Sequence, residues 1–193
     1  MIVNEIFYSL QGEGFFTGTS SLFIRYSGCN LQCNFCDTSH QSGTNMTEEE
    51  IAAEAARCPA THVVITGGEP SLQLTESLVE HLHALGKFVA VETNGTHPLP
   101  ANVDWVTLSP KYPFVQSEKA QVVLKRCNEL KMVFTGASLP DFSAIQADHL
   151  FLQPCDTPDP ERNKQILKEA IAYCLSHPQW RLSLQTHKLI GVR

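Results

Sequence analysis

Hydrophobic and polar positions along the chain change repeatedly between two periodicities, so strands and helices are expected to alternate. Short β-branched or apolar runs predict strands, whereas longer segments with apolar residues at helical spacing predict helices. The predicted strands are 21–26, 62–66, 88–92, 105–108, 131–134, 149–153 and 182–185, and the predicted helices are 47–57, 74–85 and the segment that begins at 160. This strand-then-helix repetition is typical of a parallel sheet.

The predicted helices carry start signals and apolar faces. Thr47-Glu-Glu-Glu50 reads as a capping box, so this acidic run is mostly structural. Asp159 before Pro160 is a second start signal. Two apolar stripes predict core contacts: Leu74, Leu78, Leu82 and Leu85 before Gly86, and Ile166, Leu167, Ala170, Ile171, Cys174 and Leu175. Cys174 is therefore expected to be a buried core thiol.

Composition narrows the class of protein. At 193 residues and 42% hydrophobic content, the chain is expected to form one domain over 1–193. No apolar run approaches the roughly 20 residues that span a bilayer, so no membrane segment is expected. The net charge of -6, without a basic cluster, disfavours nucleic acid and favours a small-molecule substrate.

Three cysteines carry the most specific chemical signal. They lie in Cys29-Asn-Leu-Gln-Cys33-Asn-Phe-Cys36, directly after the predicted strand 21–26, so their thiols can converge from one loop. Soft thiolates suit iron-sulfur clusters and zinc. A four-iron cube held by three thiolates keeps one iron open for another ligand, and that iron is a reaction site.

Other uses of these cysteines have to be weighed. Cys29, Cys33 and Cys36 together with His40 form the ligand set of a structural zinc site, which would make the chain a non-enzymatic zinc-binding module. A disulfide scaffold is disfavoured, because the cysteine count of seven is odd and the chain opens on Met-Ile-Val-Asn-Glu without a basic, apolar signal segment. We therefore expect the reducing cytoplasm.

Polar segments follow four of the predicted strands. Gly67-Gly-Glu-Pro70, Glu92-Thr-Asn-Gly95, Ser109-Pro-Lys111 and Gln153-Pro154 each begin where a strand ends. In barrel-like parallel sheets the chemistry sits at the carboxyl ends of the strands. Each segment alone is also an ordinary turn signal. Together with the cysteine loop, they predict a site at this edge of the sheet.

The cysteine spacing, with an aromatic residue just before the last cysteine, resembles the signature of the radical S-adenosylmethionine (SAM) enzymes, and Gly67-Gly68-Glu69-Pro70 resembles their segment that contacts the amino group of SAM. The resemblance implies a 4Fe-4S cluster on Cys29, Cys33 and Cys36, with SAM on the open iron. It also implies a shortened, open TIM-like β/α barrel. Further SAM contacts would be Phe35, Glu92, Asn94, Ser109, Lys111 and Gln153.

Three further segments narrow the resemblance. Phe7-Tyr-Ser-Leu-Gln-Gly-Glu-Gly14, Cys36-Asp-Thr38 and Gln185-Thr-His-Lys-Leu-Ile-Gly191 are similar to the 7-carboxy-7-deazaguanine synthase family. This similarity implies a carbon-nitrogen lyase of queuosine and 7-deazapurine biosynthesis. The reaction would convert 6-carboxy-5,6,7,8-tetrahydropterin to 7-carboxy-7-deazaguanine with loss of ammonia, assisted by Mg²⁺.

The same resemblance implies roles for individual residues. The substrate would contact Gln11, Glu13, Arg25, His187 and Arg193, and Thr38 would bind magnesium through its hydroxyl. A carboxylate such as Glu13 accepts from the adjacent N–H donors of an aminopyrimidinone ring, and Arg25 suits a carboxylate. No residue is expected to act as a catalytic acid or base. Asp37 remains open between a partner of the magnesium site and a turn residue.

The resemblance implies partners as well. An external reductant, for example a flavodoxin, would reduce the cluster, and the enzyme would be a homodimer. A second radical SAM class stays open at this point, the activases of glycyl-radical enzymes. These share the three cysteines but act on a large protein partner, and they would not need the contacts of Gln11, Glu13 and His187.

Overall fold

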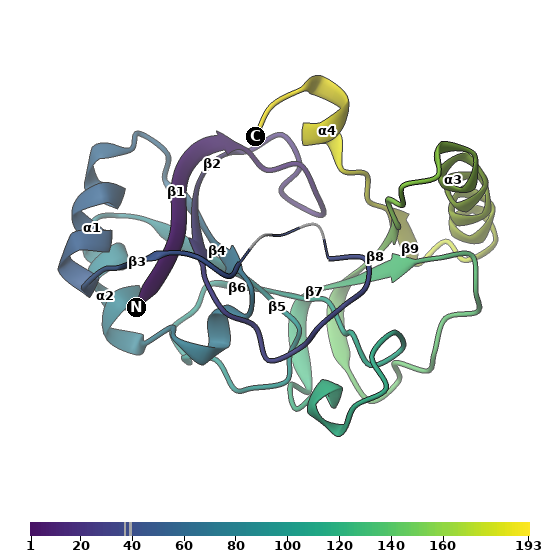
Figure 1. Ribbon diagram of the computed structural model, residues 1–193, viewed down its shortest axis with the longest axis horizontal. Helices are drawn as coiled ribbons and strands as arrows, with labels where there is room; N and C mark the ends of the chain where they lie inside the picture. The colour runs from purple at the N-terminus through teal and green to yellow at the C-terminus, as the bar shows by residue number, and fades with distance from the viewer. Residues whose placement is uncertain (37, 39) are drawn as a thin grey trace.

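A computed structural model describes residues 1–36, 38 and 40–193, and over these residues the strands form one curved sheet (Figure 1). The order is β3-β1-β2-β4-β5-β6-β7-β8-β9. The strands from β2 onward pair in parallel, apart from β3, whereas β1 pairs antiparallel with β2 and β3. Their bounds are β1 Ile2–Leu10, β2 Ser20–Tyr26, β3 Thr44–Asn45, β4 His62–Gly67, β5 Phe88–Thr93, β6 Trp105–Leu108, β7 Arg126–Phe134, β8 Gln146–Pro154 and β9 Trp180–Leu182.

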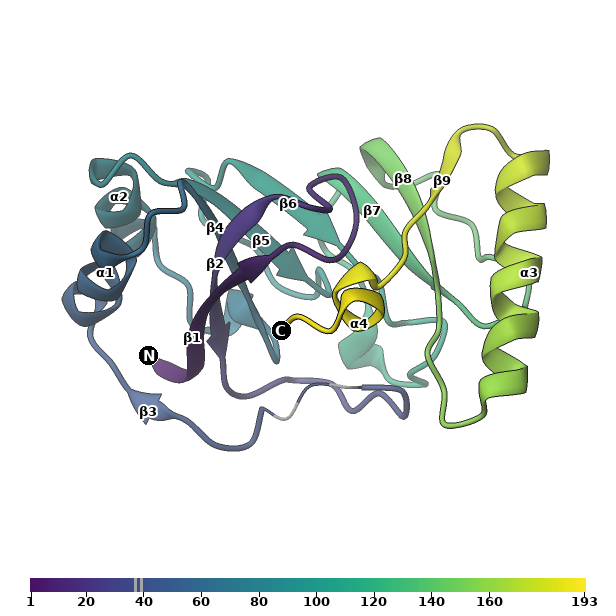
Figure 2. The ribbon, with the colours of Figure 1, turned by 90° about the horizontal axis from the view of Figure 1, so that it is seen from above.

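Helices cover the outer side of this sheet and one short helix lies over its inner side. The helices are α1 Glu48–Arg57, α2 Glu76–Ala84, α3 Pro160–Ser176 and α4 Thr186–Ile190, with 3-10 turns at Pro70–Leu72 and Glu118–Ala120. In Figures 1 and 2, α1 and α2 lie together at one end of the molecule, α3 lies at the other, and α4 lies between them. The architecture is the open, partial TIM-like β/α barrel that was expected. None of the helices in the described part of the chain is long and apolar enough to cross a membrane.

The outward-facing side chains of the strands form two hydrophobic cores. Because side chains alternate between the faces of a strand, Val63 and Ile65 of β4 pack outward with Leu78 and Leu82 of α2 in the first core. The second core joins outward residues of β6, β7 and β8 to α3 and β9, including Leu108, Leu130, Met132, Leu152, Ile166 and Trp180. The inner face carries the polar side chains of the strands, such as Arg25, Thr66 and Glu92, together with apolar ones such as Phe23.

The helix start signals are confirmed. Thr47 and Glu50 make both hydrogen bonds of a capping box at α1, and the Asp159 carboxylate accepts from the first backbone N–H groups of α3. The predicted start of the second helix was too early, because Thr75 caps α2 at Glu76. Helix starts are local features, and a side chain within three residues decides them.

The helix faces were predicted less well. Leu85, Ile171 and Leu175 are exposed, by 41%, 41% and 81%, so their assignment to the core was wrong. Leu85 follows the last residue of α2, and Leu175 lies in the last turn of α3. Cys174 is only half-buried at the edge of the second core.

Candidate active site

The inner face of the barrel encloses a cavity of about 650 Å³. Its walls are inward-facing side chains of successive strands, which the parallel register places side by side: Arg25 opposite Thr66 on β2 and β4, and Glu92 opposite Thr107 on β5 and β6. Lys131 of β7 and Gln153 of β8 complete this wall. The two hydrophobic cores outside the sheet and the chamber with charged side chains inside it therefore follow from one alternation of side chains.

The cysteine loop forms one side of the cavity. Cys29, Cys33 and Cys36 follow the carboxyl end of β2, as expected, and all three line the cavity. Cys29 and Cys33 are half-buried, and burial raises the pKa of both thiols, to which the charge of Cys36 adds. Among the described residues, no three His, Cys, Asp or Glu side chains have the arrangement of a single-ion site. Asp37 lies outside the described residues.

The Gly67-Gly68 turn after β4 packs directly on the cysteine loop. The Gly68 N–H donates to the Tyr26 carbonyl at 3.0 Å, and the Glu69 N–H donates to the Gly28 carbonyl at 2.8 Å. A Cβ atom at Gly68 would lie 1.9 Å from the Gly28 oxygen, so only glycine fits this contact. Gly67 and Gly68 both line the cavity, beside the cysteines.

Glu69 differs from the sequence expectation. Its carboxylate is fully buried and accepts from Ser71, from the Thr93 hydroxyl at 2.6 Å and from the Asn94 N–H at 2.7 Å. Glu69 does not line the cavity. Its side chain joins the ends of β4 and β5 and so acts as a positioning group, while the predicted contact of Glu69 with SAM stays a prediction.

The other residues predicted to surround SAM do line the cavity: Phe35, Glu92, Asn94, Ser109, Lys111 and Gln153. Asn94 donates to Asn30 of the cysteine loop at 3.1 Å. Lys111 donates to the Ser109 hydroxyl at 2.6 Å, and its Nζ atom lies 6.0 Å from the centre of the Phe35 ring. The ends of four strands and the cysteine loop thus meet at one chamber.

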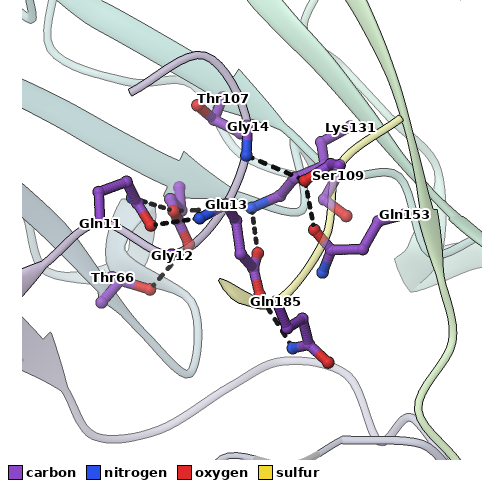
Figure 3. A network of polar contacts seen from close by, with 12 residues as sticks. Gln11, Gly12, Glu13, Gly14, Thr66, Thr107, Ser109, Lys131, Gln153 and Gln185 are labelled. Carbon is purple, nitrogen blue, oxygen red and sulfur yellow. Dashed lines mark hydrogen bonds and ion pairs between the residues drawn. The ribbon is translucent and has the colours of Figure 1, made fainter. Parts of the chain in front are cut away.

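The predicted substrate residues Gln11, Glu13, Arg25, His187 and Arg193 line the same chamber. Gln11 and Glu13 belong to the loop between β1 and β2, and the Gln11 amide donates to Glu92 at 3.0 Å. The Glu13 carboxylate lies between two donors, the Lys131 ammonium at 2.5 Å and the Gln185 amide at 2.9 Å (Figure 3).

Arg25 and the C-terminal segment meet at Glu5. The Arg25 guanidinium donates to Glu5 at 2.8 Å and to the Thr38 hydroxyl at 3.4 Å. Arg193 also pairs with Glu5, and its guanidinium lies 4.8 Å from the centre of the Phe7 ring. The chain end is therefore beside Arg25, and Glu5 neutralises part of the positive charge of both arginines.

His187 is placed by α4, an element that the sequence pattern did not predict. The Thr186 N–H and hydroxyl both donate to the Gly12 carbonyl at 2.9 Å. A Cβ atom at Gly12 would lie 2.0 Å from His187 Nδ1. The glycine therefore lets the histidine pack against the loop that carries Gln11 and Glu13.

Several cavity residues were missed, above all Lys131, Thr66, Gln185 and Glu5. For Lys131 a signal existed in the chain. In Glu129-Leu130-Lys131-Met132, charged and apolar residues alternate within a strand, and Leu130 and Met132 are core residues of the outer face. A charged residue at the alternate position of a buried strand must face a polar interior.

Comparisons with known proteins agree with this geometry. A match to the Radical SAM superfamily covers residues 23–131. A 7-carboxy-7-deazaguanine synthase from Bacteroides thetaiotaomicron is 49% identical, over 99% of this chain and 98% of that protein, and one from Bordetella pertussis is 44% identical over 98% of each. The crystal structure of QueE from Escherichia coli matches with a TM-score of 0.74 and 30% identity, over 95% of this chain and 92% of that one.

The open barrel, the three-cysteine loop at its mouth and the superfamily match define a radical SAM enzyme that acts on a small molecule. Its cofactors are a 4Fe-4S cluster and SAM, and the donor set fits them, because three thiols line a cavity beside a glycine turn. From the identity and near-complete coverage of its relatives, the chain belongs to the 7-carboxy-7-deazaguanine synthase family, a family of lyases. This membership favours the lyase over the activase and the zinc module.

Proposed function

We propose that the enzyme converts 6-carboxy-5,6,7,8-tetrahydropterin to 7-carboxy-7-deazaguanine, with loss of ammonia, on the route to queuosine. The observation that carries the proposal is the Glu13 carboxylate, which lies inside the barrel and lines the same cavity as Cys29, Cys33 and Cys36. An ionised carboxylate only accepts hydrogen bonds, and an aminopyrimidinone ring presents adjacent N–H donors.

The remaining substrate contacts follow from the groups in the chamber. Gln11 both donates and accepts at the ring, and Arg25 holds the substrate carboxylate through charge-assisted hydrogen bonds. His187 closes the ring site from α4. The chain end at Arg193 lies beside Arg25, and Glu5 neutralises part of the charge of both guanidinium groups.

The cofactor site lies along the strand ends. Cys29, Cys33 and Cys36 would hold the cluster, and the Gly67-Gly68 turn would accept from the SAM amino group through its carbonyls. Phe35, Glu92, Asn94, Ser109, Lys111 and Gln153 would surround the rest of SAM. Cluster and SAM, when bound, supply the 5'-deoxyadenosyl radical that removes hydrogen from C6 of the pterin. The chain's own task is to orient the two ligands and exclude water.

Magnesium has a candidate protein ligand in Thr38. Its hydroxyl lines the cavity 3.4 Å from Arg25, so an ion bound there would lie beside the substrate carboxylate. Magnesium is a hard ion that keeps several waters and takes further oxygens from substrate, so one neutral protein ligand is sufficient.

The proposal also includes an electron donor, a homodimer and a cytoplasmic location. The cluster needs an external electron donor, such as a flavodoxin, and the exposure of Cys36 supports access of such a donor to the cluster loop. A homodimer is supported by the exposed apolar side chains of α4, among them Leu189 and Ile190, which are 73% and 59% exposed. A cytoplasmic location suits thiols that must stay reduced.

The test is product formation by the anaerobically reconstituted enzyme. With SAM, reductant, magnesium and the carboxytetrahydropterin, we expect 7-carboxy-7-deazaguanine by mass spectrometry. Cys29→Ala should lose the cluster and all product, because a second iron loses its thiolate. Cys58→Ala is the matched control, since this half-buried thiol lies at the first core, and it should cost roughly 1 kcal/mol of stability while the product remains.

Two results would contradict the proposal. Full turnover by Cys29→Ala would show that Cys29 is not a ligand of the cluster. SAM cleavage without any deazaguanine would keep the radical SAM chemistry but exclude this substrate.

A further inference from the structure

Lys131 is a buried charged residue to which the proposed function gives no role. Its side chain is only 7% exposed and projects from β7 into the barrel. The ammonium lies 2.5 Å from Glu13 Oε2 (Figure 3). It also lies 3.6 Å from Glu92 Oε1. A lysine is almost never buried without such partners.

Lys131 belongs to a set of inner side chains that hold the loop between β1 and β2. Next to Glu13, the Gly14 N–H donates to the Ser183 hydroxyl at 2.9 Å, and the Phe15 N–H donates to Glu129 at 3.0 Å. Three consecutive residues of the loop are thus fixed by β7 and by the residue after β9. Lys131 is the member of this set that contacts a side chain facing the substrate cavity.

The contact between Lys131 and Glu13 determines whether the Glu13 carboxyl is ionised. Glu92 of β5 and Glu129 of β7 are further carboxylates near Lys131, Lys111 after β6 is a second cation, and His187 of α4 packs on the adjacent Gly12. Burial raises the pKa of Glu13, but Lys131, by its charge and its hydrogen bond, and the amides of Gln185 and Gln153 lower this pKa to about 2.

The protonation and orientation of the Glu13 carboxyl determine which hydrogen-bonding groups it offers to the aminopyrimidinone ring. An ionised carboxylate offers acceptors on both oxygens, and the hydrogen bonds from Lys131 to Oε2 and from Gln185 to Oε1 do not use all of its lone pairs. A protonated carboxyl would place an O–H against ring donors, and a rotated one would miss them. Recognition therefore needs both the charge and the orientation of this group.

We propose that Lys131 is a positioning residue for substrate recognition, which holds the Glu13 carboxylate ionised and aimed at the aminopyrimidinone ring. This inference rests on the proposed function for the identity of the ring. The contact between Lys131 and Glu13 does not depend on the identity of the ring. The proposed role of Lys131 and the proposed function can therefore be disproved separately.

The first measurement needs no substrate. In the anaerobic holoenzyme labelled with carbon-13 at glutamate carboxyl groups, the Glu13 signal is assigned by its loss in Glu13→Gln. We expect it not to titrate above about pH 4 in the unmodified protein, and to titrate above the ordinary value of 4.5 in Lys131→Met, where burial acts without compensation. A Glu13 signal that titrates near 4.5 in the unmodified protein overturns the proposal, even if Lys131→Met does not fold.

The second measurement is the affinity of the SAM-loaded holoenzyme for 6-carboxypterin between about pH 4.5 and 7. The unmodified enzyme should bind independently of pH in this range. In Lys131→Met the carboxylate must first lose its proton, so affinity should fall about tenfold for each pH unit below the raised pKa. Lys131→Arg keeps a cation and should restore the flat profile. In a Glu13→Gln background, Lys131→Met should add no pH dependence.

Lys87→Met is the matched control. Lys87 is also buried, but it donates to the carbonyls of Cys58 and Ala60, away from the cavity. Lys87→Met should lower the stability of the protein and leave its affinity for 6-carboxypterin independent of pH. A Lys131→Met profile as flat as that of Lys87→Met overturns the proposal, because a merely structural lysine would behave in this way. Failure of the unmodified enzyme to bind 6-carboxypterin would contradict the proposed function, while the Glu13 titration would still decide the role of Lys131.

Discussion

At the scale of residues, the site is a chain of polar contacts in which few groups act alone. Gln11 reaches Glu92, Glu13 reaches Lys131, and Arg25 reaches both Glu5 and Thr38. Glu13 and Arg25 are thus held by Lys131 and Glu5, two partners that the sequence pattern did not point to, whereas Gln11 is held by the predicted site residue Glu92. The exchange of one acceptor for a donor in such a network is costly, because it leaves the opposing donors unpaired.

Glu13→Gln tests this directly. The change keeps the size of the side chain but places an N–H against the ring and against Lys131, which should cost about 1 to 3 kcal/mol. We expect 6-carboxypterin affinity to fall about 5- to 150-fold, while SAM binding and iron content stay as they were. Isothermal titration with each ligand measures both. Equal losses of SAM and pterin affinity would indicate a folding defect and not a lost ring contact.

At the scale of elements, prediction from the sequence succeeded where the signal was local. The capping box of α1, the Asp159 cap of α3 and the buried strand β4 follow from residues close in the chain. The pattern missed β1, the start of β7 at Arg126 and helix α4, and it placed the last strand at 182–185 although β9 covers Trp180–Leu182.

The missed elements share a physical cause. β1 and the first half of β7 mix polar with apolar residues, so neither segment has the continuous apolar run of a strand buried on both faces. Helix α4 has five residues and no side-chain cap, and its place depends on the Gly12 carbonyl, which is distant in sequence. The motif residues were therefore found from the sequence, but β1 and α4, which position the loop with Gln11 and Glu13 and the residue His187, were not.

Helix α4 should depend on the fit at Gly12 more than on its surface charges. In Gly12→Ala the new methyl group meets the His187 ring, and such overpacking costs typically 1 to 3 kcal/mol. We expect faster proteolysis at α4 and weaker pterin binding. The control is Lys188→Met, which removes a partly exposed ion pair with Asp156 worth about 1 kcal/mol or less. Limited proteolysis that cut Lys188→Met faster than Gly12→Ala would contradict this account.

At the scale of the whole molecule, one sheet separates two environments. Its outer face carries two hydrophobic cores under α1 with α2 and under α3, and its inner face carries the polar chamber. Since one sheet joins both cores, we propose that residues 1–193 form a single domain. The loop between β1 and β2 lines this chamber, so Gln11 and Glu13, two of the residues proposed to bind substrate, face it.

The proposal that substrate binds inside the barrel at Glu13 is tested most directly by a crystal structure of the reconstituted enzyme with SAM and 6-carboxypterin. The account predicts a cluster on Cys29, Cys33 and Cys36, with the pterin ring inside the barrel and its N–H groups within hydrogen-bond distance of Glu13. The ring carboxylate should lie at Arg25. A pterin bound outside the barrel, or a Glu13 carboxylate that contacts only Lys131 and Gln185 while the ring lies elsewhere, would contradict it.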